Sequence, residues 1–330
     1  MAVEVVTLQQ LGSVGKLLGT GGQARVFKAP NIQLPDAPGP LVYKEYKAGH
    51  DARLGPRQLV KFRNALDPDR RAKLDRCTAW PLRVVENGSQ VSGVLMPLID
   101  KSFMQTRKLP GTGAKKTSPR EVQNLLVPAQ RAMLVGMPVV TEEQRMTVCR
   151  DLAAALYLLH SEQLVFGDLN AKNELFRIGE YPSVMLVDCD GIRKKGSMAE
   201  IAQLDAPDWD GPERWLTTQS DCYKFGLFVL RVFSTGDQQS TTRDPARADA
   251  VLDADGRRLL RATLSEVPGA RPPIEDWGFY FRYRLTGKPP PHDIGAPAPQ
   301  QRQPVAVSTS QTTSTRGWVR DKVTGRWTPL

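Results

Sequence analysis

The chain has 330 residues, of which 40% are hydrophobic, and it carries a formal net charge of +10. A chain of this length and apolar content can bury a large core as one two-lobed unit or as two domains. No run approaches the roughly 18 apolar residues that a membrane-spanning helix needs, so we expect no membrane span.

The cysteines and the first residues favour a cytoplasmic protein. The cysteines lie far apart, without a C-x-x-C pair, at positions Cys77, Cys149, Cys189 and Cys222. This spacing predicts reduced, mostly buried thiols, in preference to disulfides or zinc ligands. Residues 1–11 contain Glu4 and Gln9 and lack a basic segment, so we expect no signal peptide.

The first hundred residues predict a small strand-rich lobe. Short apolar runs, separated by turn-forming residues, predict strands at residues 14–18, 24–29, 41–44, 82–86 and 90–95. Asn87-Gly88, between the last two strands, is a strong hairpin signal. Residues 54–74 have helical spacing, which Asp67-Pro68 interrupts.

Two segments account for the whole net positive charge of the chain. Residues 101–120 contain six Lys or Arg residues and no acid, and residues 288–330 contain six basic and two acidic residues. Both segments are rich in Gly, Pro, Ser or Thr, which predicts mobile or irregular backbone carrying solvated charge. A nucleic-acid-binding domain would more typically show a basic stripe on a folded face, so we do not expect nucleic acid as a partner.

Beyond the first basic segment the pattern becomes helical. Thr141, followed by two glutamates and a glutamine, predicts the start of a helix that runs to about His160. Later helices are expected at residues 219–235 and 255–264. His50 and His160 lie in no liganding cluster, so we expect both to be structural.

The chemistry is concentrated in two short stretches. Asp168 and Asn173 lie five residues apart on one expected loop, and Asp188 follows the apolar run 184–187. Magnesium takes oxygen ligands and shares them with phosphates, so these three side chains suit a hard cation, a nucleoside triphosphate and a hydroxyl nucleophile. An Asp and an Asn in a loop are by themselves more often a turn, so the surrounding order of elements must decide.

A glycine-rich turn joins the first two predicted strands. Its backbone N–H groups could approach phosphate oxygens closely, and Val26 on the second strand would lie over a planar base. A plain hairpin would look similar, so the turn alone is a weak signal. More specific is the order of elements: two strands around the turn, Lys44 ending a third strand, a helix, two strands, and then a helical part with the acidic loop.

Over roughly residues 12–285, this order resembles the protein kinase-like superfamily, most closely a divergent bacterial branch with a G-D-x-x-x-x-N loop and a D-x-D-G magnesium motif. The glycine turn resembles G-x-G-x-x-G with Ala24 as its third position, and Leu41 to Lys44 resembles V-A-I-K. The remaining similarities are Phe166-Gly167-Asp168 to H-R-D, Val187-Asp188-Cys189-Asp190-Gly191 to D-F-G, Gly211-Pro212-Glu213 to A-P-E, Asp221 to the helical aspartate that braces the catalytic loop, and Arg271 to the arginine that pairs with the A-P-E glutamate.

The resemblance implies an α+β, two-lobed protein kinase-like fold, with a small antiparallel β-sheet lobe at residues 1–97 and a mainly helical lobe at residues 98–287. Residues 288–330 would form a disordered tail. It also implies ATP and magnesium (Mg2+) as cofactors, and phosphoryl transfer to hydroxyl groups of protein substrates. Ser/Thr substrates are favoured by family membership alone, because the loop residues do not separate Ser/Thr from Tyr.

Roles for individual residues follow from the same resemblance. Asp168 would be the catalytic base, Lys44 would bind the α- and β-phosphates, and Lys172 would reach the γ-phosphate because Asn170 stands where a lysine is usual. The implied metal ligands are Asn173, Asp188 and Asp190. The implied nucleotide-binding residues are Gly19, Thr20, Gly21, Gly22, Ala24, Val26, Val42, Lys44, Met96 and Leu98, with the backbone around Leu95 to Leu98 at the adenine edge.

Two departures from the pattern leave other functions open. Residues 51–80 contain no Glu, so the usual partner of Lys44 is missing or is replaced by Asp67 or Asp75. Gly167 replaces the H-R-D arginine, which makes Ser197 a poor candidate for a phosphorylation switch. The alternatives are a nucleotide-binding pseudokinase or scaffold, and a phosphotransferase acting on small molecules.

The C-terminal segment has a separate motif at its end. After Pro289-Pro290-Pro291 the sequence is rich in Gln, Ser and Thr, and it ends with Trp318 and Trp327 on either side of a turn. This end is expected to form a short hairpin or a docking peptide for a partner, or to be a remnant of a longer architecture.

Overall fold

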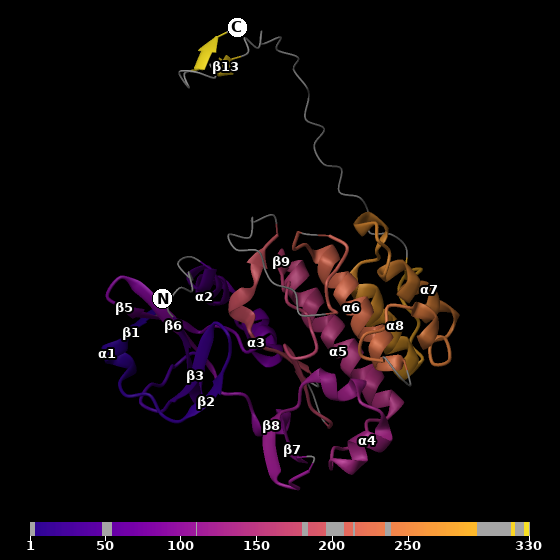
Figure 1. Ribbon diagram of the computed structural model, residues 1–330, viewed down its shortest axis with the longest axis horizontal. Helices are drawn as coiled ribbons and strands as arrows, with labels where there is room; N and C mark the ends of the chain where they lie inside the picture. The colour runs from indigo at the N-terminus through magenta and orange to yellow at the C-terminus, as the bar shows by residue number, and fades with distance from the viewer. Residues whose placement is uncertain are drawn as a thin grey trace. The chain divides into compact units, whose positions relative to one another are not determined.

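The computed structural model describes residues 4–47, 55–109, 111–179, 184–195, 208–213, 215–234, 239–295, 318–320 and 327–329. The chain divides into two units, residues 1–298 and 299–330. Figure 1 shows the elements in chain order.

The helices are α1 (Leu8–Leu11), α2 (Gly55–Ala65), α3 (Pro68–Cys77), α4 (Ala129–Leu134), α5 (Glu142–Ser161), α6 (Thr218–Phe233), α7 (Ala254–Thr263) and α8 (Ile274–Thr286), with single 3-10 turns η1 (Lys101–Phe103), η2 (Val122–Leu126), η3 (Cys189–Gly191), η4 (Pro245–Ala248) and η5 (Pro268–Ala270). The strands are β1 (Val5–Thr7), β2 (Leu17–Thr20), β3 (Ala24–Ala29), β4 (Leu41–Tyr46), β5 (Arg83–Asn87), β6 (Gln90–Pro97), β7 (Met104–Lys108), β8 (Lys115–Pro119), β9 (Leu164–Val165), β10 (Glu174–Phe176), β11 (Val184–Leu186), β12 (Arg193–Lys194), β13 (Trp318–Arg320) and β14 (Trp327–Pro329).

The N-terminal part is built on a six-stranded sheet in the order β1-β5-β6-β4-β3-β2. The five predicted strands are confirmed as β2 to β6, all paired antiparallel. Strand β1 was not predicted, and it adds to the edge parallel to β5. The hairpin at Asn87-Gly88 is confirmed, and Gly88 has a φ of +62°, which glycine adopts without a steric penalty.

The helical stretch predicted after the third strand forms two helices, and its interruption lies where Asp67-Pro68 was expected to break it. The Asp67 side chain accepts a hydrogen bond from the Arg70 backbone N–H at 2.9 Å and so caps α3. Pro68 occupies the first helical position, where its missing N–H costs no hydrogen bond.

Buried arginines tie α2 to its surroundings. Arg63 of α2 is fully buried and donates to Asp75 of α3 and to Asp36 in the loop between β3 and β4, both within 2.8 Å. Arg83 of β5 forms a second ion pair with Asp36. One carboxylate therefore joins α2, the sheet and a surface loop.

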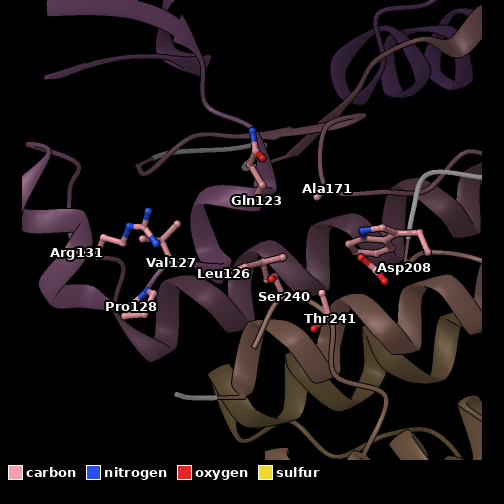
Figure 2. A pocket seen from close by; sticks show the side chains of 10 residues that line it. Gln123, Leu126, Val127, Pro128, Arg131, Ala171, Asp208, Ser240 and Thr241 are labelled. Carbon is pink, nitrogen blue, oxygen red and sulfur yellow. The ribbon is translucent and has the colours of Figure 1, made fainter. Parts of the chain in front are cut away.

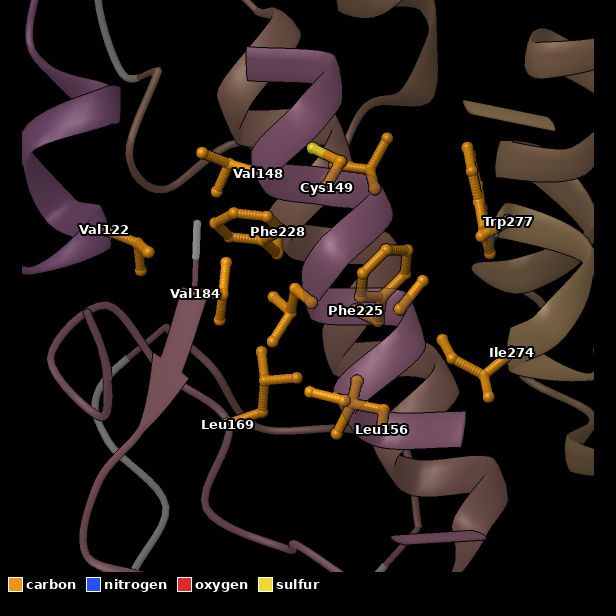
Figure 3. Close-up of a cluster of buried hydrophobic side chains, with 14 of the residues drawn as sticks. Val122, Val148, Cys149, Leu156, Leu169, Val184, Phe225, Phe228, Ile274 and Trp277 are labelled. Carbon is orange, nitrogen blue, oxygen red and sulfur yellow. The ribbon is translucent and has the colours of Figure 1, made fainter. Parts of the chain in front are cut away.

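The C-terminal part packs around α6, in which every residue from Ser220 to Phe233 is buried. Helix α5 begins at the predicted cap, where Thr141 and Gln144 bond to each other's backbone N–H groups. Figure 3 shows apolar side chains of α5, α6 and α8 interleaving, among them Leu156, Phe228 and Trp277. A helix buried on all sides holds any polar residue it carries inside the core, which matters for the site below.

The prediction of irregular backbone over residues 101–120 is wrong. After η1, the segment forms the antiparallel hairpin β7–β8, whose register runs from Met104 opposite Pro119 to Lys108 opposite Lys115. The Thr106 and Thr117 hydroxyls lie opposite each other and are 2.8 Å apart. Strand pairing satisfies the backbone N–H and C=O groups, which an irregular backbone would have left to water.

The start of the predicted tail packs on α8. Asp276 of α8 accepts a hydrogen bond from the Gly295 backbone N–H at 2.7 Å and faces the His292 ring at 2.9 Å. Farther on, β13 and β14 pair antiparallel, which agrees with the short hairpin, one of the alternatives for the segment with Trp318 and Trp327. The disorder predicted between these elements, and the structural role predicted for His50, concern residues outside the described ranges.

One general expectation is also met. All four cysteines are free, and Cys149, Cys189 and Cys222 are buried. Across the described ranges, no helix combines the length and the apolar character needed to cross a membrane.

Replacing Asp36 tests how much the buried ion pairs with Arg63 and Arg83 contribute to the stability of the fold. Burial raises the pKa of Asp36, but hydrogen bonds and charges from Arg83 and Arg63 outweigh it and hold the pKa at about 2. Because this folded-state pKa lies below the ordinary value of 3.8, the stabilisation is complete above about pH 4 and is lost as the pH falls toward 2.

We therefore expect Asp36→Asn to lower the free energy of unfolding at pH 7 by about 3 kcal/mol, because it leaves buried arginine charge uncompensated. Urea denaturation between pH 3 and 7 measures both effects, and the variant should lose less stability on acidification. Asp69→Asn, at an exposed position on α3, is the control. An unchanged midpoint for Asp36→Asn would contradict the assignment.

Candidate active site

The lysine predicted at the end of the third strand meets the acids that follow β11. Lys44 Nζ donates to Asp190 Oδ1 at 2.6 Å and to Asp188 Oδ1 at 3.1 Å. Tyr46 Oη, two residues along β4, donates to the other oxygen of Asp190 at 2.9 Å. Side chains about 145 residues apart in sequence thus meet.

Exposure distinguishes the two acids. The Asp190 side chain is 8% exposed and the Lys44 side chain 12%, whereas that of Asp188 is 58% exposed. Both oxygens of Asp190 are used within the protein, by Lys44 and Tyr46. Asp188 therefore has the carboxylate that is open to a ligand, while Asp190 is held inside.

The charges of this group follow from its burial. Burial lowers the pKa of Lys44, but the charges of Asp190 and Asp188 outweigh it and raise the pKa above its usual value. Burial raises the pKa of Asp190, and the charge and hydrogen bond of Lys44 bring it below its usual value. Burial and the Asp190 charge raise the pKa of Tyr46, so its hydroxyl stays neutral and donates.

The prediction that Asp67 or Asp75 replaces the missing glutamate partner of Lys44 is wrong. Asp67 caps α3, and Asp75 binds Arg63 at 2.7 Å. Asp190 supplies the close carboxylate instead. The sequence contained this residue as a departure from D-F-G, but nothing in the pattern indicated that it would turn toward Lys44.

The loop between β9 and β10 holds Asp168 between two amides. Asn173 Nδ2 donates to Asp168 Oδ2 at 2.7 Å, and Asn170 Nδ2 donates to Oδ1 at 3.1 Å. Burial raises the pKa of Asp168, and the Asn170 hydrogen bond and the charge of Lys224 partly oppose this. A carboxylate fixed by amides, with its pKa raised, is suited to accept a proton.

A buried aspartate of α6 supports this loop, as the resemblance implied. Asp221 accepts hydrogen bonds from the backbone N–H groups of Phe166 and Gly167, each at 2.8 Å, and its Oδ2 lies 3.0 Å from His160 Nε2. This contact agrees with the structural role expected for His160. The support comes from the core helix and not from the surface.

The departure from H-R-D at Gly167 has a backbone explanation. Gly167 has a φ of +78°, a conformation that an arginine would adopt only with strain. Its carbonyl oxygen accepts a hydrogen bond from Lys224 Nζ at 2.7 Å, and Lys224 is buried on α6. Sequence reasoning missed Lys224 and Tyr46, because neither belongs to a motif of the family.

The two halves of the site are joined by strand pairing. The Val187 backbone N–H donates to the carbonyl of Asn173 at 2.8 Å, and the Asp188 charge raises the pKa of Asp168, so these groups are neighbours. Asp188 itself has a left-handed backbone, with φ of 57°. Aspartate tolerates this conformation better than most residues do.

The donor set is compatible with magnesium. In the described part of the chain, no group of three or more His, Cys, Asp or Glu side chains has a metal-binding arrangement. Magnesium does not need one, because one or two protein oxygens suffice when phosphates and water complete its shell. Asp188 has an exposed carboxylate, and Asn173 turns its Nδ2 to Asp168, so its Oδ1 is the end with lone pairs for a cation.

Most predicted nucleotide-binding residues also come together. Val42 lies opposite Met96, and Val26 lies opposite Lys44, in neighbouring strand pairs. One small apolar cluster contains all four of the predicted apolar contacts to the base, namely Val26, Val42, Met96 and Leu98. This cluster is separate from the two larger cores, and Val42 and Met96 are buried within it.

The glycine turn and the backbone at the predicted adenine edge match the implied nucleotide-binding roles less completely. A Cβ atom added at Gly19 or Gly22 would meet nothing within 4 Å, so packing in the protein does not require glycine there. Thr20 lies opposite Arg25 on β3, Gly21 donates to the carbonyl of Ala24 at 2.9 Å, and Ala24 is buried. At the predicted edge, the Leu98 N–H already donates to Pro40, and the Leu95 carbonyl already accepts from Leu82.

Lys172 lies at the side of the loop. Its backbone N–H donates to Asn170 Oδ1 at 2.9 Å, while its side chain is exposed. Burial raises the pKa of Glu121, and the positive charge of Lys172 opposes part of this rise, so Lys172 lies near Glu121. A contact with a γ-phosphate therefore stays a prediction.

The last implied contact, between Arg271 and the A-P-E glutamate, is present. Arg271 is fully buried and binds Glu213 through two nitrogens, one of them at 2.9 Å. It also donates to the carbonyl of Gln219, next to the start of α6. Ser197 lies outside the described residues.

Comparison with known proteins adds one match. A family model described as protein tyrosine and serine/threonine kinase matches residues 101–266, about half of the chain. The matched range contains the loop of Asp168, the acids that follow β11 and the supporting helix α6. No curated protein matches the chain.

Asp221→Asn tests the support under the loop. An asparagine has one acceptor oxygen where Asp221 uses two, so at least one buried N–H at Phe166 or Gly167 would lose its partner. We expect the free energy of unfolding to fall by about 1–3 kcal/mol. Chemical denaturation measures this loss, and Asp255→Asn, in an exposed pair with Arg258, is the control. Equal stability of the two variants would argue against the role of Asp221.

Proposed function

The chain belongs to the protein tyrosine and serine/threonine kinase family, and on this premise we propose that it transfers the γ-phosphoryl group of ATP, with magnesium, to Ser or Thr hydroxyls of proteins. The observation that carries the proposal is the contact of Lys44 with Asp188 and Asp190, beside the loop that holds Asp168. Catalysis in this family depends on positioning and charge stabilisation, which is what such a group supplies.

Asp168 is the base in this proposal. Its carboxylate accepts the proton of the substrate hydroxyl as the hydroxyl oxygen attacks the γ-phosphorus. The bond from that phosphorus to the bridging oxygen breaks, and its electron pair leaves with ADP. The amides of Asn170 and Asn173 keep the carboxylate oriented throughout, and the raised pKa of Asp168 favours proton acceptance.

The remaining residues position the nucleotide. Asp188 and Asn173 would hold magnesium, which when bound would neutralise charge on the phosphates. Lys44 would bind the α- and β-phosphates, Lys172 would reach the γ-phosphate, and the glycine turn would cover them. For Asp190 we propose that it orients Lys44, in place of the metal-ligand role implied by the resemblance, because both its oxygens are engaged.

A nucleotide-binding pseudokinase is the second candidate. It is favoured by the absence of a helix glutamate beside Lys44 and by Gly167 in place of the H-R-D arginine. The carboxylate of Asp190 weakens the first argument, since Lys44 does have a buried anionic partner. Transfer to small hydroxyl compounds is a third outcome that the same experiment detects.

The direct test is transfer of labelled phosphate from ATP and magnesium to a generic protein substrate. We expect labelled protein, and a fall of at least a hundredfold for Asp168→Ala because the base is lost. Asp151→Ala, on α5, is the control. Thermal stabilisation by nucleotide without transfer would support the pseudokinase, and label only on small compounds would support the third function.

A second experiment separates the two roles of Asp190. If Asp190 orients Lys44, Asp190→Asn should lower kcat about tenfold or more, and Tyr46→Phe should lower it by a smaller factor, because each removes part of the same arrangement. If Asp190 is a metal ligand, Asp190→Asn should raise the half-saturating magnesium concentration and Tyr46→Phe should have no effect. Asp75→Asn, which alters the rejected partner, should keep kcat near the wild-type value.

A further inference from the structure

The ordered basic hairpin β7–β8 has no role in the chemistry above. Its register sets Arg107 opposite Lys116 and Lys108 opposite Lys115. Like charges directly opposite each other destabilise a strand pair, and residues 104–119 contain no acid, although Glu121, just beyond them, interacts with the charge of Arg107. Glu121 offsets part of the charge of Arg107, and an external anion would supply the compensation that the lysines lack.

The segment that directly follows the hairpin is bonded to the loop of Asp168 and to β10. The Gln123 backbone N–H donates to the carbonyl of Ala171 at 3.0 Å, and the Phe176 N–H donates to the carbonyl of Arg120 at 3.0 Å. Charges from Lys172 on that loop and from Arg107 on the hairpin both act on Glu121. The hairpin therefore has a fixed position beside the residues that would transfer phosphate.

The two sides of the hairpin differ. Cross-strand partners share a side and neighbours along a strand alternate, so Arg107 and Lys116 share one side with the buried Gln105. Lys108 and Lys115 share the other side with the exposed Thr106. The Arg107 side chain is partly buried, and its Nε is buried without a hydrogen-bond partner among the described residues. That atom is enclosed by the protein, so the exposed Lys116 is the group of this side that an external ligand reaches first.

A hollow of about 370 Å³ adjoins the same loop. Figure 2 shows Ala171 and Gln123 at its edge, with Arg131 of α4 and Asp208 among the other lining residues. The end of α4 is bonded to the hairpin, because the Lys108 N–H donates to the carbonyl of Val135 at 2.9 Å. A recess and a basic edge therefore lie on connected elements.

We propose that the inner basic side of the hairpin, Arg107 with Lys116, binds an acidic segment of the protein substrate and so selects phosphoacceptor sites flanked by Asp or Glu. The proposal rests on the kinase function proposed above. The chain's own residues 288–330 carry a net charge of +4 and would be repelled. Nucleic acid is disfavoured because residues 104–119 contain no aromatic side chain on which a base could stack.

Binding tests the surface without requiring catalysis. A fluorescent peptide with a central Ser flanked by Glu residues, compared with the same peptide carrying Gln, is titrated into the full chain and followed by anisotropy. We expect tighter binding of the Glu peptide and an approximately fivefold rise in its Kd for Lys116→Glu. Lys115→Glu makes the same charge change on the outer side, and it should alter the Kd little.

Several results would overturn the proposal. Equal effects of Lys116→Glu and Lys115→Glu would mean long-range attraction without a defined surface. Equal binding of the two peptides, or tighter binding of an oligonucleotide of matched charge, would also contradict it.

A second experiment measures phosphoryl transfer and tests whether the inner basic side of the hairpin affects substrate selection. In a position-scanning Ser/Thr peptide library, wild type should prefer Asp or Glu at one or more flanking positions, and Lys116→Glu should reverse that preference toward Lys or Arg. Asp168-dependent transfer without acidic preference would refute this inference and leave the kinase function intact. Acidic-peptide binding without any transfer would refute the kinase function and leave only the binding surface.

Discussion

The ion pair between Lys44 and Asp190 is the contact on which the site depends. It joins the sheet of the N-terminal part to the segment that follows β11, and Tyr46 closes the arrangement from the same strand. Both partners are nearly buried, so neither charge would be stable there without the other. The pairing leaves Asp188 as the exposed acid and gives Lys44 a partner that comes from neither α2 nor α3.

Below this contact, the reactive loop is supported by polar groups of the core helix. Asp221 accepts two backbone N–H groups of the loop, and Lys224, one turn along α6, donates to the carbonyl of Gly167. Groups buried this deeply remain paired because an unpaired polar group in a core is strongly destabilising. The loop around Asp168 is consequently positioned by α6, whose own place is determined by apolar packing on every side.

The distribution of charge has a structural meaning that composition alone concealed. One of the two basic segments is a regular hairpin, and the turn η2 that follows it is bonded to the reactive loop. Solvated charge on an irregular segment would carry little information, whereas charge on a fixed edge can discriminate among substrates. The hairpin and the supporting helix thus have different roles. Helix α6 holds the reacting groups in place, and the hairpin is suited to selecting the substrate that reaches them.

The sequence by itself determined the family resemblance, five of the six strands of the sheet, the break between α2 and α3, the cap of α5, and the approach of Lys44 to Asp188, because these depend on local patterns and on their order along the chain. It did not determine which acid would neutralise Lys44. Asp67 and Asp75 were nearer in sequence to the expected helix, yet one became a cap and the other bound Arg63. Tertiary structure alone decided the roles of Asp190, Tyr46 and Lys224. It also decided that the basic segment forms the regular hairpin β7–β8. The physical reason is that buried charges and strand partners are chosen by distance in space, which a linear pattern does not encode.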